Sequence, residues 1–145
     1  MKALLLLTLV LFVGCNSDHR NNQMSEDTNA IQCLRRLISK DNFAEVPGTL
    51  YTGVQNPSER IKLNTQFSSA VELLIAAANH GATTSEYLAI IDKQINGFER
   101  AHLDTEDAEQ VASNFELALN CLGIESSGGR VSALGSHKRH RHFLL

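Results

Sequence analysis

The stretch DTEDAEQVASNFELALNCLGI, residues 104–124, decides the fold. It opens with Asp104, whose side chain can accept hydrogen bonds from the first free amides of a helix, and acids follow in the first turn, where the helix dipole favours negative charge. Apolar residues then recur at helical spacing, at Ala108, Val111, Ala112, Phe115, Ala118, Leu119 and Leu122. Gly123 followed by Ile124 is typical of the Schellman motif that ends a helix. The stretch therefore predicts an amphipathic helix with one buried face.

Three upstream segments carry similar signals. Thr83-Thr84-Ser85-Glu86 fits a capping box and predicts a helix to about Gly97, and Asn56-Pro57-Ser58-Glu59 predicts another that ends at Asn79-His80-Gly81. A further helix is expected from Asp27 or Thr28 to about Lys40, with Ile31, Leu34, Leu37 and Ile38 on one stripe. No stretch alternates in the manner of a strand. We therefore predict an all-α fold, a compact antiparallel four-helix array over residues 27–129.

A long loop is expected between the first and second predicted helices. Residues 41–56 contain Pro47-Gly48 and Gly53 with only scattered apolar residues, and an extended piece is expected at Thr49 to Val54. Sixteen residues exceed what a connector between two helices needs. Long ordered loops often carry function, so this loop is the first place to expect a binding surface.

The amino-terminal segment has the anatomy of an export signal. Lys2 precedes an apolar run from Ala3 to Val13, too short to span a bilayer comfortably, and Gly14-Cys15 follows at once. Residues 11–15 resemble the lipobox of bacterial lipoproteins, in which the Cys is lipidated, although Phe12 departs from its usual residues. The alternatives are a conventional secretory signal cut near Ser17 and an uncleaved anchor.

The lipobox interpretation divides this end of the chain at Cys15. Residues 1–14 are then a signal peptide, and residues 15–26 a lipidated Cys with a polar tether. We expect the protein in the bacterial cell envelope, attached to a membrane through lipid on Cys15. Asn16 after the Cys slightly favours the outer membrane, facing the periplasm.

The two other cysteines, Cys33 and Cys121, form an even pair for an oxidising compartment, where a disulfide can persist. They lie 88 residues apart, near the two ends of the predicted domain. Closing such a loop would stabilise the fold by up to about 4 to 5 kcal/mol in the chain-entropy model. The alternative is two independently buried thiols on helical apolar faces.

Composition and charge bound the function. With 145 residues, 43% of them hydrophobic and 20% charged, the chain has room for one compact domain. Residues 27–124 hold seven Lys and Arg against thirteen Asp and Glu, which indicates a solvated acidic surface or an electrostatic site for a basic partner. Nothing suggests nucleic-acid binding.

Residues 130–145 are expected to form a disordered, basic, His-rich tail. His137, His140 and His142 could wrap a transition metal, but Lys138, Arg139 and Arg141 lie among them and would repel a cation. We therefore predict no metal site in the tail.

Other candidate chemistry also has a simpler explanation. The acids Asp104, Glu106, Asp107 and Glu109 could suggest paired carboxylates or a calcium site, but a helix amino terminus accounts for them. The chain has no Walker loop, GxGxxG, HExxH, CxxC or GxSxG motif. We predict no catalytic residue and no cofactor.

The carboxy-terminal half resembles a bacterial family called domain of unknown function 4844. The resemblance rests on residues 102–107, on Phe115-Glu116 and above all on LGIESSGG, residues 122–129, and it reaches back to about Asn56. It implies a compact helical domain without an assigned activity. Family sequences continue after Gly128-Gly129 with apolar and aromatic residues including a Trp, so the basic tail departs from the pattern.

Two functions remain open. In the first, the protein is an interaction module, of inhibitor or immunity type, that binds an unknown protein through its acidic body and the loop at Thr49 to Val54. In the second, it is an enzyme of unrecognised type acting in the envelope, and a pocket with converging His or acidic side chains would favour it.

Overall fold

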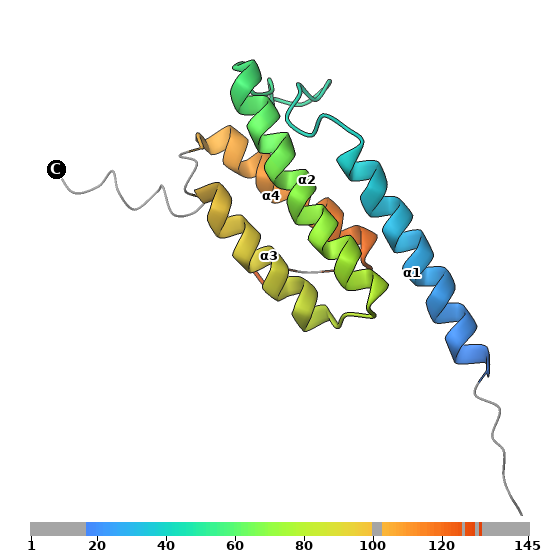
Figure 1. Ribbon diagram of the computed structural model, residues 1–145. Helices are drawn as coiled ribbons and strands as arrows, with labels where there is room; N and C mark the ends of the chain where they lie inside the picture. The colour runs from blue at the N-terminus through green and yellow to red at the C-terminus, as the bar shows by residue number, and fades with distance from the viewer. Residues whose placement is uncertain (1–16, 100–102, 126, 130, 132–145) are drawn as a thin grey trace, which may run out of the picture.

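The computed structural model describes residues 17–99, 103–125, 127–129 and 131. Within these ranges it has four helices and no strand, which confirms the predicted fold class: α1 (Ser17–Ile38), α2 (Pro57–Asn79), α3 (Thr84–Glu99) and α4 (Thr105–Cys121). Consecutive helices run in opposite directions, and α4 passes behind α2 in the view of Figure 1. α1 and α3 each pack against both α2 and α4.

The first helix is longer than the sequence predicts. α1 begins at Ser17 and not at Asp27 or Thr28, so the polar segment expected to be a tether is helical from Ser17 onward. No Pro or Gly occurs between Ser17 and Ile38, so no strong helix breaker stops the helix from extending toward the amino terminus. The helix ends at Ile38. The hydroxyl of Ser39, the next residue, donates to the carbonyl oxygen of Arg36 at 2.9 Å.

The other three helices begin at the predicted signals. α2 and α4 also end where predicted, and α3 runs two residues past Gly97 to Glu99. Each start is capped by the expected side chains: Asn56 before α2, Asp104 before α4, and for α3 Thr83 together with Glu86 of its first turn. At the end of α4, Gly123 has a positive φ and the amide of Ile124 donates to the carbonyl of Leu119 at 3.0 Å, as in a Schellman motif. These caps satisfy backbone groups that a helix end would otherwise leave unpaired.

The core is centred on Phe115. Its ring packs edge-to-face against Phe67 of α2, with centroids 5.5 Å apart, and against Phe98 of α3 at 5.8 Å. All three rings are fully buried. Such pairs contribute about 0.5 to 1.5 kcal/mol each beyond the burial of their surface. Phe115 therefore joins α2, α3 and α4 at one point.

The core also extends past the predicted domain boundary at Gly129. Val131 is only 1% exposed and belongs to the core, and Ser127 is buried as well. A tail that begins at residue 130 would leave this apolar side chain in water. The folded part therefore reaches at least Val131, because burying a Val side chain is favourable by about 1.5 to 3 kcal/mol.

α1 is held to the rest of the fold by a covalent bond as well as by packing. From residue 28 onward, where its side chains are described, its buried apolar side chains are Leu34 and Leu37. Cys33 forms a disulfide with Cys121, the last residue of α4, and their Cα atoms lie 5.5 Å apart. The bond closes a loop of 88 residues, so it ties α1 to the end of α4.

Replacing Phe115 with Ala should lower the free energy of unfolding by about 3 to 5 kcal/mol, because the change removes buried surface and leaves a cavity between three helices. Denaturant unfolding of the purified chain measures the loss. Leu117→Ala is the matched control, since Leu117 lies on the same helix but is 46% exposed. An unchanged midpoint for Phe115→Ala would show that the core lies elsewhere.

Breaking the disulfide should lower the free energy of unfolding by about 2 to 5 kcal/mol, because the unfolded chain regains the entropy of an 88-residue loop. The comparison is thermal unfolding of the oxidised chain, the reduced chain and the Cys33→Ala/Cys121→Ala variant. The last two should agree. Intact-mass analysis of protein produced in an oxidising compartment that finds two free thiols would contradict the bond.

Candidate functional site

The loop between α1 and α2 folds back on itself, so that the end of the segment expected to be extended, Thr49 to Val54, lies beside residues 43–46. The backbone amide of Val54 donates to the carbonyl oxygen of Phe43 at 3.0 Å. The backbone amide of Val46 donates to the carbonyl oxygen of Tyr51 at 3.3 Å. Phe43 and Val54 are buried at the base. Gly53 has a φ of +76°, and a Cβ there would overlap the backbone of Ala44 and Glu45. The close approach of the two halves thus requires glycine at 53.

A buried polar cluster anchors the start of this loop. The Asn42 amide donates to the side chain of Asn64 on α2 at 2.9 Å. The Asn42 carbonyl accepts from Gln110 at 3.0 Å and from Asn114 at 3.1 Å, both on α4. The Asn42 side chain donates to the carbonyl of Leu37 at 2.9 Å. Because a buried polar group without a partner is costly, these bonds fix where the loop leaves α1.

Sequence reasoning missed this cluster, although one signal was present. Asn114 occupies a position on the buried stripe of α4, between Val111 and Phe115, and is only 3% exposed. A polar residue on an apolar stripe indicates a partner brought by another element. Asn42 lies 72 residues before Asn114, so the sequence does not indicate that Asn42 is this partner.

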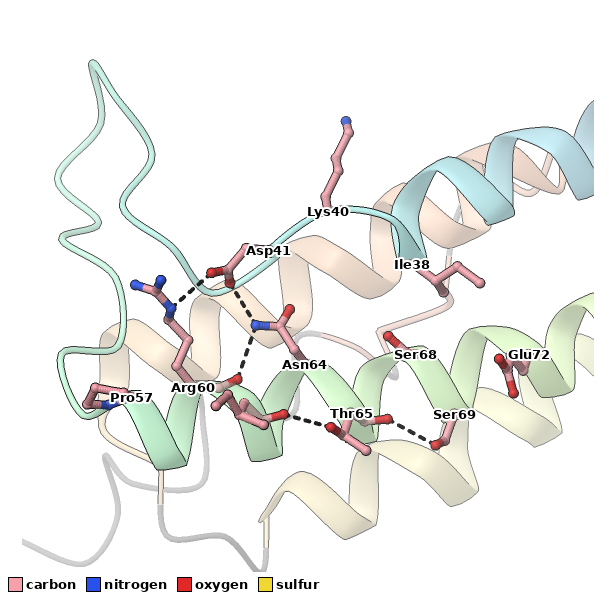
Figure 2. Close-up of a pocket in the computed structure, with 11 residues that line it drawn as sticks. Ile38, Lys40, Asp41, Pro57, Arg60, Asn64, Thr65, Ser68, Ser69 and Glu72 are labelled. Atoms are coloured by element: carbon pink, nitrogen blue, oxygen red, sulfur yellow. Dashed lines mark hydrogen bonds and ion pairs between the residues drawn. The ribbon is translucent and has the colours of Figure 1, made fainter.

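A shallow groove of about 530 Å³ lies between the end of α1 and the first turns of α2, shown in Figure 2. Arg60 pairs with Asp41 at 2.9 Å, and Asn64 donates to the same carboxylate at 2.7 Å. The hydroxyls of Thr65 and Ser69 donate to carbonyls of their own helix. Asp41, Arg60 and Asn64 therefore bind one another and hold the start of the loop on α2.

A second hollow, of about 590 Å³, lies between the loop and α4. We call it the loop–α4 hollow, and its lining residues are Val46, Thr49, Leu50, Tyr51, Glu106, Glu109, Gln110, Ser113 and Leu117. Among the described residues, the exposed large apolar side chains are Val46, Leu50, Ile61, Leu73 and Leu117. Three of these five line this one hollow, and Leu50 is 96% exposed. The predicted binding loop therefore meets α4 where exposed apolar surface is concentrated.

Leu117 of this hollow was not predicted, although its position in α4 is unusual. It follows Glu116 and precedes the buried Ala118, so it lies off the apolar stripe of the helix. A large apolar residue on the solvated face of a helix is a signal for an interface. Single exposed apolar residues are common on protein surfaces, so Leu117 indicates an interface only because Leu50 and Val46 lie in the same hollow.

Tyr51, which lines the hollow, is held on α4 by Asp107. The phenol of Tyr51 donates to a carboxylate oxygen of Asp107 at 2.9 Å. Burial, the hydrogen bond to Asp107 and the charges of nearby acids raise the pKa of Tyr51 well above its ordinary value. Burial raises the pKa of Asp107 also, opposed by the hydrogen bond from Tyr51 and reinforced by neighbouring acids. The phenol therefore stays protonated and keeps the loop on α4.

Of the acids considered in the sequence analysis, Glu106 and Glu109 line this hollow, and the remaining candidate residues lie apart from it or outside the described residues. Cys15 and the tail histidines His137, His140 and His142 fall outside the described ranges. Asp104 caps α4 by accepting from the amide of Asp107 at 2.8 Å. In the described part of the chain, no group of three His, Cys, Asp or Glu is placed to hold a metal ion. None of its helices has the length and apolar character needed to cross a membrane.

Comparison with known proteins extends the resemblance seen in the sequence. The family model described as domain of unknown function (DUF4844) matches residues 24–135. The chain is also similar to the crystal structure of a DUF3571 family protein from Acinetobacter baumannii AYE, with 34% identity and a TM-score of 0.73 over 79% of this chain and 94% of that one. No curated protein matches the chain. The family match includes part of α1 and passes Gly129, in agreement with the buried Val131.

Tyr51→Phe should lower the free energy of unfolding by about 0.5 to 1.5 kcal/mol near neutral pH, because it removes the hydrogen bond to Asp107. A phenol whose pKa is raised by folding stabilises the fold fully below its ordinary value of about 10, and this stabilisation is lost as the pH rises above it. The difference between the two proteins should therefore shrink above pH 10. A constant difference from pH 8 to 11, measured by denaturant unfolding, would contradict the assignment.

Proposed function

We propose that this chain, which belongs to the DUF4844 family, is a lipid-anchored module of the bacterial cell envelope that binds another protein through the loop–α4 hollow. The observation that carries the proposal is the gathering of Val46, Leu50 and Leu117 in one hollow. Exposed apolar side chains that cluster beside polar ones are typical of protein-binding surfaces. An inhibitor or immunity-type role is the form of this function that we favour.

The loop is well suited to binding because it is held before any partner arrives. Asn42 ties its start to α2 and α4, Phe43 and Val54 bury its base, and Tyr51 bonds to Asp107. A partner that meets an ordered loop does not have to supply the free energy needed to order it. This arrangement supports recognition by a prepared surface.

The alternative, an enzyme of unrecognised type, has less support. A general base or nucleophile needs an orienting partner and a pKa suited to its task. Tyr51 and Asp107 are in contact, but the raised pKa of Tyr51 keeps the phenol a hydrogen-bond donor. The pair therefore suits a structural role better than a catalytic one.

The position of α1 supports attachment through Cys15. Ser17 is the first residue of α1, and the loop follows the other end of this helix. A helix of 22 residues is about 33 Å long. In Figure 1 the amino-terminal end of α1 projects beyond the other helices. Lipid on Cys15 would thus place the hollow away from the bilayer, and the Cys33–Cys121 disulfide is consistent with an oxidising compartment.

The binding surface can be tested by capture from envelope extracts with the tagged full chain. Leu50→Asp and Leu117→Asp should each reduce the amount of the captured partner at least about tenfold, since a charge in an apolar contact is costly. Leu73→Asp should change it less than about twofold. Leu73 is 46% exposed on α2, as Leu117 is on α4, so it is a matched control. Equal losses for all three variants, or no loss for the first two, would refute the surface.

Lipidation has a separate test. Cys15→Ala should abolish labelling of the protein by a fatty-acid probe in expressing cells and release it from the membrane fraction. Cys33→Ala keeps the lipobox-like residues and serves as the control, so it should label normally. Unchanged labelling of the Cys15→Ala variant would show that the anchor is wrong.

A further inference from the structure

The two elements that form the loop–α4 hollow carry charge of one sign. Residues 41–56 of the loop and residues 104–121 of the cap and α4 contain no Lys, Arg or His. Their charged residues are Asp41, Glu45, Asp104, Glu106, Asp107, Glu109 and Glu116. Asp41 is paired with Arg60 of α2, and the positive charges of the described chain lie on the other helices or at Lys40. The hollow is therefore an anionic surface around an apolar centre.

The residues of α4 that line the hollow are arranged along the axis of the helix. Glu106, Glu109, Ser113 and Leu117 follow one another at three- and four-residue spacing, so they lie along one face of α4. Glu106 and Glu109 are exposed at the amino-terminal end of this face, and Leu117 lies near its other end. Leu117 lies eleven positions after Glu106, which corresponds to about 16 Å along the helix. An extended segment of about five residues would cover this length.

We propose that the hollow binds a cationic segment of a partner protein, in which Lys or Arg residues accompany one or two large apolar side chains. The inference rests on the proposed protein-binding function and names the chemistry of the partner. The cations would lie at Glu106 and Glu109, and the apolar side chains would contact Leu117, Leu50 and Val46. Lys and Arg suit this surface because their stems pack on apolar groups while their charges reach the carboxylates.

The test uses three labelled 12-residue peptides and the oxidised full chain, with affinity measured by fluorescence anisotropy. One peptide contains Lys and Leu, the second has Ser in place of Leu, and the third has Glu in place of Lys. The first should bind most tightly, and added salt should weaken its binding because these charges are exposed. Equal binding of the Lys and Glu peptides would overturn the proposal. Equal binding of the Leu and Ser peptides would show a general cation surface and would also overturn it.

Variants of the chain locate the contact. Glu106→Gln and Glu109→Gln should each weaken binding of the Lys–Leu peptide about two- to fivefold, as expected for exposed ion pairs. Glu72→Gln, which removes an exposed acid from α2, should leave it unchanged. Equal effects of all three variants would overturn the assignment to this hollow. Unfolding curves of each variant confirm that the fold is kept.

The chain's own tail is another possible occupant, because it contains Lys138, Arg139 and Arg141. If neutralising these three residues in the full chain tightened binding of the Lys–Leu peptide, the tail would be the occupant and the partner assignment would be overturned. The two proposals can also fail separately. Capture that is lost with Leu50→Asp but unchanged with Glu106→Gln/Glu109→Gln would leave protein binding in place and refute a cationic partner.

Discussion

The edge-to-face contacts of Phe115 with Phe67 and Phe98 pack α4 against α2 and α3 in the centre of the core. α4 is placed by this ring, and the rest of its buried stripe follows from the helical spacing around it. Once α4 is fixed, its opposite face is fixed too, and that face presents Glu106, Glu109 and Leu117 to the loop. The surface that we propose for binding therefore depends on the packing of a residue that does not belong to it.

α1 and the loop are attached to this three-helix unit by different means. α1 contributes Leu34 and Leu37 to the core, and Ile31 and Ile38 pack against it partly buried. The disulfide and the Asn42 cluster add to this packing. Cys33 lies five residues before the end of α1, and Asn42 lies four residues after it. Because both connections reach α4, the loop and the helix beneath it keep one relative position. A fixed position is what a preformed binding surface requires.

The family match and the structural similarity establish the fold on independent grounds and leave the activity to the chemistry of the surface. Two features of this surface, its exposed apolar side chains and its single sign of charge, come from different residues of the same two elements. Apolar contact supplies most of the affinity of a protein interface, whereas charge mainly governs specificity and the rate of encounter. A site with both features can discriminate among partners of similar hydrophobicity.

The sequence alone determined the helix count, the caps at Asn56, Thr83 and Asp104, the stop at Gly123 and the existence of a long loop. These features depend on residues a few positions apart, so their signals are local. Only the tertiary structure decided that Asn42 binds Gln110 and Asn114, that Val131 completes the core, and that Leu50 and Leu117 share a hollow. The start of α1 at Ser17 was also beyond the sequence signals, because a polar segment without Pro or Gly is compatible with either helix or tether. The contacts of Asn42, Val131, Leu50 and Leu117 join residues far apart in the chain. No spacing rule within one segment specifies which distant segment will pack against it.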